Sequence, residues 1–190
     1  MSGVIEFDAV DTLTAGAIGE PGERTFLIQA RKNDAELTVV VEKEQVALLA
    51  TEVVSFLDRV SGEYPEARDA DTSGFAHTSL TDAEPLFRAS LIGLGFDPAR
   101  DMVLIELREN SPDEESIDHP SGEGAVESAA LFAGSESTGD EGFVAKIFAS
   151  RPQVRAMASL GAVAVAAGRP LCDLCDQPLD PDGHVCPRMN

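Results

Sequence analysis

Residues 24–60 decide the fold class, and they read RTFLIQARKNDAELTVVVEKEQVALLATEVVSFLDRV. Arg24–Arg31 and Ala35–Val41 are β-rich runs, and Lys32-Asn33-Asp34 between them is a favourable turn, so this part predicts a β-hairpin. Apolar residues then recur with the i, i+3, i+4, i+7 spacing of an amphipathic helix, at Val46, Leu49, Ala50, Val53, Phe56, Leu57 and Val60. The stretch therefore predicts strand, turn, strand, helix.

A second unit of this kind is indicated downstream. When the chain is shifted by 108 residues, Val39–Thr51 aligns with Ile147–Ser159, and in both segments a strand ends, a short charged turn follows and Gln-Val opens a helix. Met102–Arg108 and Phe143–Ala149 are the strands expected before the second helix. One face of that helix is formed by Val154, Met157, Ala158, Gly161, Ala164 and Val165, and its small residues permit close packing. Short helical patterns also align by chance, so the duplication stays open.

The order of the elements points to one fold class. Further strands are expected at Val4–Phe7, around Thr14–Ile18 and at Leu86–Leu94. About six or seven strands and two main helices, in runs of strands followed by helices, indicate an α+β fold. Its sheet is expected to be largely antiparallel, with the helices packed on one face. Residues 1–168 are expected to form this body.

Glu109–Glu141 interrupts the second unit with ten acidic residues and no Lys or Arg. Such a composition buries too little apolar surface to offset the entropy of an ordered chain. We interpret it as a disordered acidic loop of the body, interrupted at most by a short helix at Ala125–Ala133. A solvated spacer is the favoured interpretation, and an acidic attraction for a basic partner is the alternative.

Length, charge and the N-terminus exclude several classes of function. The 190 residues are enough for one domain, or for a domain with a small appendage. Apolar runs such as Leu160–Ala167 are far shorter than the roughly 20 residues of a membrane-spanning helix. Met1–Glu6 lacks the basic start and apolar run of a signal peptide, so we expect a cytoplasmic protein. The net charge of −20 disfavours nucleic acid and anionic membrane surfaces as partners.

All three cysteines lie near the C-terminus, at Cys172, Cys175 and Cys186, and His184 precedes the last one. The spacing C-x2-C-x8-H-x-C provides three sulfur ligands and one nitrogen ligand within 15 residues, and the Asp-Pro-Asp-Gly run between the pairs folds the chain back. We predict that these four residues bind a structural zinc ion. The predicted zinc-binding tail comprises residues 169–190.

Other interpretations of the cysteines are weaker. A redox Cys-x-x-Cys is expected at the start of a helix, but prolines flank this one, and an odd number of cysteines cannot pair internally. A free Cys-x-x-Cys with an incidental third thiol on a flexible tail remains the alternative. A nucleic-acid-binding knuckle is improbable, because the flanking residues Asp173, Asp176, Asp180 and Asp182 are acidic.

No catalytic motif stands out elsewhere. Gly16–Arg24 resembles a glycine-rich phosphate loop, but it lacks the Gly-Lys-Ser/Thr ending and no helix follows, so we interpret it as a β-turn. His77 and His119 have no evident nucleophile or second ligand nearby and are interpreted as solvent-exposed. The catalytic residues, if there are any, are therefore unknown.

Two segments carry a family resemblance. TAGAIGEPGERTFLIQAR, residues 14–31, and GRPLCDLCDQPLDPDGHVCPR, residues 168–188, resemble the actinobacterial domain of unknown function 3090 family. The likeness spans essentially the whole chain, and the ending is its most specific part. It implies a cytoplasmic protein of unknown activity, typically encoded beside a histidine-phosphatase-like and a kinase-like protein. Such neighbours suggest a phosphate-related pathway and assign no chemistry to this chain.

Two functions follow as hypotheses. The first is a non-enzymatic protein-binding or adaptor module with a structural zinc site, whose partner is another protein. The second is a small enzyme or ligand-binding subunit acting on a phosphorylated or nucleotide substrate. A concave basic pocket would favour the second, and its candidate residues are Arg24, Arg31, Arg88, Arg100, Arg108, Arg151 and Arg155. A uniformly acidic surface would favour the first.

Overall fold

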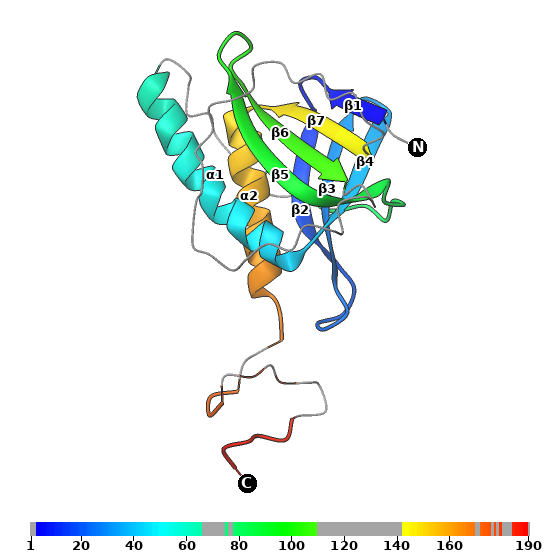
Figure 1. The fold of residues 1–190 in the computed structure, drawn as a ribbon, viewed down its shortest axis with the longest axis vertical. Coiled ribbons are helices and arrows are strands. Elements are labelled where there is room, and N and C mark those ends of the chain that lie inside the picture. Colours follow the sequence, from blue (N-terminus) through cyan, green and yellow to red (C-terminus); the bar gives the residue numbers. More distant parts are fainter. Residues whose placement is uncertain are drawn as a thin grey trace, which may run out of the picture.

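The computed structural model describes residues 3–65, 75, 78–109, 142–169, 172–175, 177, 179 and 184–189. These residues form seven strands and two helices (Figure 1). In chain order they are β1 (Gly3–Phe7), β2 (Thr12–Ile18), β3 (Thr25–Lys32), β4 (Ala35–Val41), α1 (Lys43–Glu63), β5 (Phe87–Asp97), β6 (Met102–Glu109), β7 (Phe143–Ala149) and α2 (Arg151–Ala166).

The strands of the described residues form one sheet in the order β1-β7-β6-β5-β4-β3-β2. Neighbouring strands run antiparallel except for β1 with β7 and β4 with β5, which are parallel. The predicted hairpin is confirmed, because β3 and β4 are antiparallel neighbours with Lys32 opposite Ala35. The predicted α+β class, with a largely antiparallel sheet, is confirmed as well.

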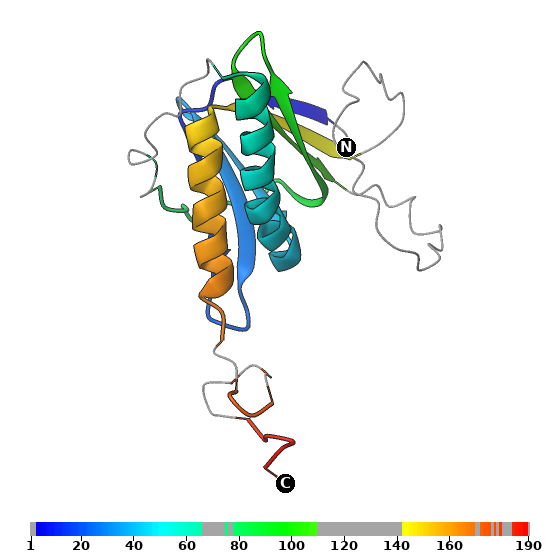
Figure 2. The same cartoon turned by 90° about the vertical axis from the view of Figure 1, so that its left-hand side faces the viewer.

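Both helices pack on one face of the sheet, side by side and in opposite directions (Figure 2). Every residue of the predicted apolar stripe of α1 except Ala50 is buried. On α2, Gly161 lies where the helix meets α1 and β2, and an added Cβ would stand 2.9 Å from Val46 Cγ1 and 3.4 Å from Ala15 Cβ. The close packing predicted from the small residues of α2 is therefore present.

The two helices begin in the same way. Gln45 Oε1 accepts a hydrogen bond from Glu42 N at 2.8 Å, and Gln153 Oε1 accepts one from Ser150 N at 2.9 Å. Both pairs are related by the same shift of 108 residues. Each helix follows three strands, β2–β4 or β5–β7, one more than the predicted unit contains. Similar caps also arise independently at helix starts, so the duplication is not confirmed.

The other face of β2, β3 and β4 is covered by residues 78–86, which lead toward β5. Gln29 of β3 is buried and binds this segment with both amide atoms: Nε2 donates to Thr81 O at 2.8 Å, and Oε1 accepts from Thr81 N at 2.9 Å. Leu80 packs over Gly16, where a Cβ would lie 2.9 Å from Leu80 Cδ1. The central hairpin is thus buried on both faces.

Several sequence predictions lie outside the described residues. These are the acidic loop beyond Glu109, with its short helix at Ala125–Ala133, and also His77 and His119. The strands before and after the loop are paired, with Arg108 opposite Val144. In the described part of the chain, neither helix is long and apolar enough to cross a membrane.

Candidate metal centre

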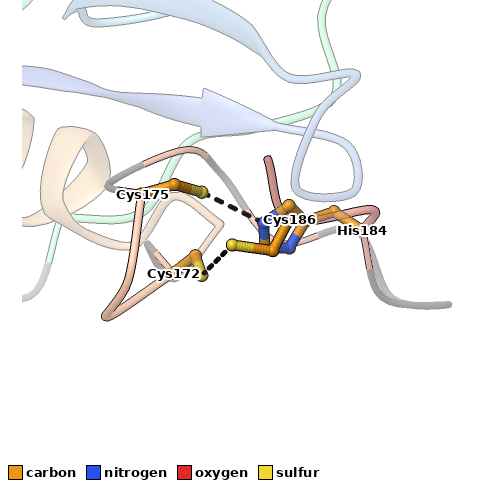
Figure 3. A group of neighbouring side chains, drawn as sticks. All are labelled: Cys172, Cys175, His184 and Cys186. Carbon is orange, nitrogen blue, oxygen red and sulfur yellow. Dashed lines mark hydrogen bonds between the residues drawn. The ribbon is translucent and has the colours of Figure 1, made fainter. Parts of the chain in front are cut away.

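The four predicted ligands follow the end of α2, in a segment that extends away from the sheet (Figure 1). Its described residues form turns and no helix or strand. Cys172 N donates to Gln177 O at 2.8 Å, and this bond closes the Cys-x-x-Cys turn so that both thiols face the same way (Figure 3). His184 and Cys186 approach them from the other side.

The ligand atoms of Cys172, Cys175, His184 and Cys186 all lie within 4.8 Å of one another. The two closest contacts cross between the pairs: Cys172 Sγ to Cys186 Sγ is 3.9 Å, and Cys175 Sγ to His184 Nε2 is 3.2 Å. A disulfide would need about 2.05 Å, so the three thiols are free. A tetrahedral zinc ion with Zn–S bonds of about 2.3 Å places two sulfurs roughly 3.8 Å apart, which fits this arrangement.

The two thiols of the turn differ in acidity. Backbone N–H groups of Leu174 and Cys175 point at the Cys172 sulfur and lower the pKa of that thiol. The Gln177 N–H lowers the pKa of Cys175, but burial and hydrogen bonding with Cys172 and Cys186 outweigh it and raise the pKa. Cys172 therefore loses its proton before Cys175, and a cation among the sulfurs would favour the thiolate at every position.

His184 presents Nε2 to the sulfurs, while its Nδ1 is buried and has no hydrogen-bond partner in the described part of the chain. An imidazole aimed at three thiols suits a metal ligand better than a surface histidine would. Cys172 and Cys186 are buried, and Cys175 and His184 are half-buried. The donor set therefore fits a borderline-soft divalent ion that is largely shielded from water.

The family model described as "Protein of unknown function (DUF3090)" matches residues 5–186. The chain belongs to this family. The DUF3090 match covers the sheet, both helices and all four candidate ligands, and it ends at Cys186. The comparison with curated proteins and the comparison with solved structures gave no match. The resemblance to DUF3090 proteins is thus confirmed, and it assigns no activity.

The glycine-rich segment of this DUF3090 protein forms the end of β2 and the turn before β3. Glu23 N donates to Glu20 O at 2.9 Å, and Gly19 and Gly22 have φ values of 102° and 111°. The β-turn interpretation is confirmed. Glycine is favoured at both positions because side chains rarely adopt such a φ.

A cleft of about 440 Å³ lies where this turn, the start of α1 and the end of α2 meet. Four cationic side chains line it, Arg24, Lys43, Arg88 and Arg169, with one carboxylate, Glu42. Two of the seven arginines proposed for a basic pocket therefore line one cleft, and the other five do not. The sequence predictions missed the two remaining cations because no local motif links residues of four separate segments.

Proposed function

We propose that this DUF3090 protein is a non-enzymatic protein-binding module whose C-terminal segment is held by a structural zinc ion. The observation that carries the proposal is the set of four ligand atoms within 4.8 Å of one another. Three thiolates and an imidazole complete a tetrahedral coordination sphere, which leaves no position for a substrate. So short a segment has almost no apolar core, and metal binding would supply most of its folding free energy.

Exposed apolar side chains beside the ligands support a role in protein binding. Leu174 is 46% exposed, Val185 is 82% exposed and Met189 is 76% exposed. A metal clamp would hold these side chains in a fixed arrangement, which lowers the entropy cost of docking on another protein. Apolar groups gathered at the surface are typical of protein-interaction sites.

The zinc proposal is tested by elemental analysis of freshly reduced protein purified without added metal. About one equivalent of zinc is expected. Cys175→Ser should lower the zinc content sharply and make residues after Pro170 sensitive to protease, because the clamp loses one ligand. Asp173→Ser is the matched control, since Asp173 is exposed in the same turn and should leave the zinc content unchanged. No stoichiometric zinc, or an unchanged content in Cys175→Ser, would overturn the proposal.

The protein-binding part is tested by affinity capture from a lysate with quantitative mass spectrometry. A protein retained by the wild type and lost with both Cys175→Ser and Val185→Ser is expected, because the first change removes the clamp and the second removes an exposed apolar contact. The Val185→Ser variant should keep its zinc. Proteins retained equally by all three forms would contradict a role of this surface.

The second candidate function is a ligand-binding subunit, or a small enzyme, acting on a phosphorylated or nucleotide substrate. One observation favours it, namely the cleft with four cations in a chain of net charge −20. Concave sites of a few hundred Å³ are typical of small-molecule binding.

A further inference from the structure

The cations of this chain are unevenly distributed. The sequence contains 14 Lys and Arg residues against 34 Asp and Glu residues, yet four of the cations line one cleft with a single carboxylate. Like charges placed together in a concave site repel one another, and an anion bound among them relieves that repulsion. The cleft is therefore electrostatically opposite to the chain as a whole.

The cleft is built at one end of the molecule, where four segments meet (Figures 1 and 2). Arg24, from the turn after β2, donates through Nη1 to Ala164 O of α2 at 3.3 Å, which fixes its guanidinium against the last turn of that helix. Arg88 of β5 pairs with Glu42 at the start of α1. Both arginines are thus oriented by the protein before any ligand arrives, which reduces the entropy lost on binding.

Two glycines make room for the remaining cations. A Cβ on Gly22 would stand 3.4 Å from the Arg169 guanidinium carbon, so this glycine lets the guanidinium approach the turn. A Cβ on Gly168 would stand 3.6 Å from Lys43 Nζ, in ordinary contact with the amine. No hydrogen bond or ion pair of Lys43 is present within the described residues, and its side chain is exposed at the first position of α1.

We propose that this cleft binds a small ligand that carries a phosphoryl group, held by Arg24, Lys43 and Arg88 and enclosed by Arg169. Guanidinium forks and a lysine amine together are the side chains that recognise phosphate oxygens. Phe26 and Val165 also line the cleft and provide an apolar wall for the rest of the ligand. The ligand is small, since the acidic remainder of the chain repels a polyanion such as nucleic acid.

The proposal rests on the second candidate function and specifies its ligand class and residues. It is tested by calorimetric titration of the full-length protein with inorganic pyrophosphate, and with citrate as a non-phosphate anion of similar charge. Saturable binding of pyrophosphate, weakened by added salt, is expected, with a Kd at or below about 1 mM. Arg88→Gln and Lys43→Gln should each weaken it by about tenfold or more, because each removes one charged contact.

Arg100→Gln is the matched control, since Arg100 lies in the β5–β6 turn, away from the cleft, and should leave the affinity within about twofold. Pyrophosphate bound equally by both cleft variants would place the anion elsewhere and overturn the inference while the second candidate function survives. Citrate bound as tightly as pyrophosphate would overturn the phosphoryl class. No saturable binding would overturn the inference and the second candidate function together, and the zinc content would still report on the first.

Discussion

At the scale of single residues, Gln153 shows how one side chain joins a helix to a distant segment. Its Oε1 accepts from Ser150 N at 2.9 Å, and its Nε2 donates to Val10 O at 2.8 Å and to Asp11 O at 3.1 Å. Gln153 is buried, so the groups it satisfies have little access to water. A buried polar group without a partner destabilises the fold by about 1–3 kcal/mol.

Gln153→Leu is expected to lower the free energy of unfolding by about 1–3 kcal/mol, because it leaves the Val10 carbonyl buried without a donor. Gln45→Leu is the matched control at the start of α1. Gln45 is half-buried and donates to Ser90 O at 3.0 Å, beside an exposed residue where water can replace the amide, so the cost should stay below about 1 kcal/mol. Urea titration of both variants measures the difference, and equal losses would contradict it.

The residues of the two candidate sites were not equally predictable. The four ligand residues share one 15-residue stretch, and the chemistry of thiols and imidazole is specific enough to suggest zinc from spacing alone. The cleft offers no such signal, because Lys43 and Arg169 are ordinary surface cations until α1 and α2 bring their ends together. Sequence could therefore name two of its arginines as candidates among seven, and no more.

At the scale of elements, the contact of α2 with α1 and β2 depends on the absence of a side chain at Gly161. A larger residue there would meet Val46 Cγ1 and Ala15 Cβ, atoms that belong to two different elements of the core. Overpacking of a core contact costs about 1–3 kcal/mol, which exceeds the gain of roughly 1 kcal/mol that a better helix former brings.

Gly161→Leu is therefore expected to lower the free energy of unfolding by about 1–3 kcal/mol despite the better helix propensity of leucine. Val163→Leu, on the exposed side of the same helix, should change it by less than about 0.5 kcal/mol. Thermal or urea unfolding compares the two. A Gly161→Leu variant as stable as the wild type would mean that the helices can separate without loss.

Local elements followed from their periodicity, whereas their pairing did not. The runs at Ala35–Val41 and Phe143–Ala149 were predicted with the bounds that the structure has, since alternation and flanking turns are local signals. The parallel pairing of β1 with β7 joins segments about 140 residues apart, and no local pattern encodes it. The cover formed by residues 78–86 has neither helical nor strand periodicity, so only tertiary contacts define it.

At the scale of the whole molecule, the acidic stretch between β6 and β7 can be removed in a controlled way. These strands are antiparallel neighbours with Arg108 opposite Val144, so their ends already lie side by side. Replacing residues 112–138 with a short Gly/Ser linker should leave the melting temperature within a few degrees, because loop length has only a weak logarithmic cost. Calorimetry measures this, and loss of the folded state would show that the stretch contributes to the core.

The parallel pairing of the first strand with the seventh has a consequence for biosynthesis. A ribosome delivers Gly3–Phe7 early, but the partner of that strand, Phe143–Ala149, emerges only after most of the chain has been made. Until then one edge of the nascent sheet has no neighbour, and α2, which packs against β2 and α1, has not been synthesised. Such long-range contacts slow folding and leave strand edges open to misassembly. Chains truncated before Phe143 should therefore depend on chaperones or aggregate.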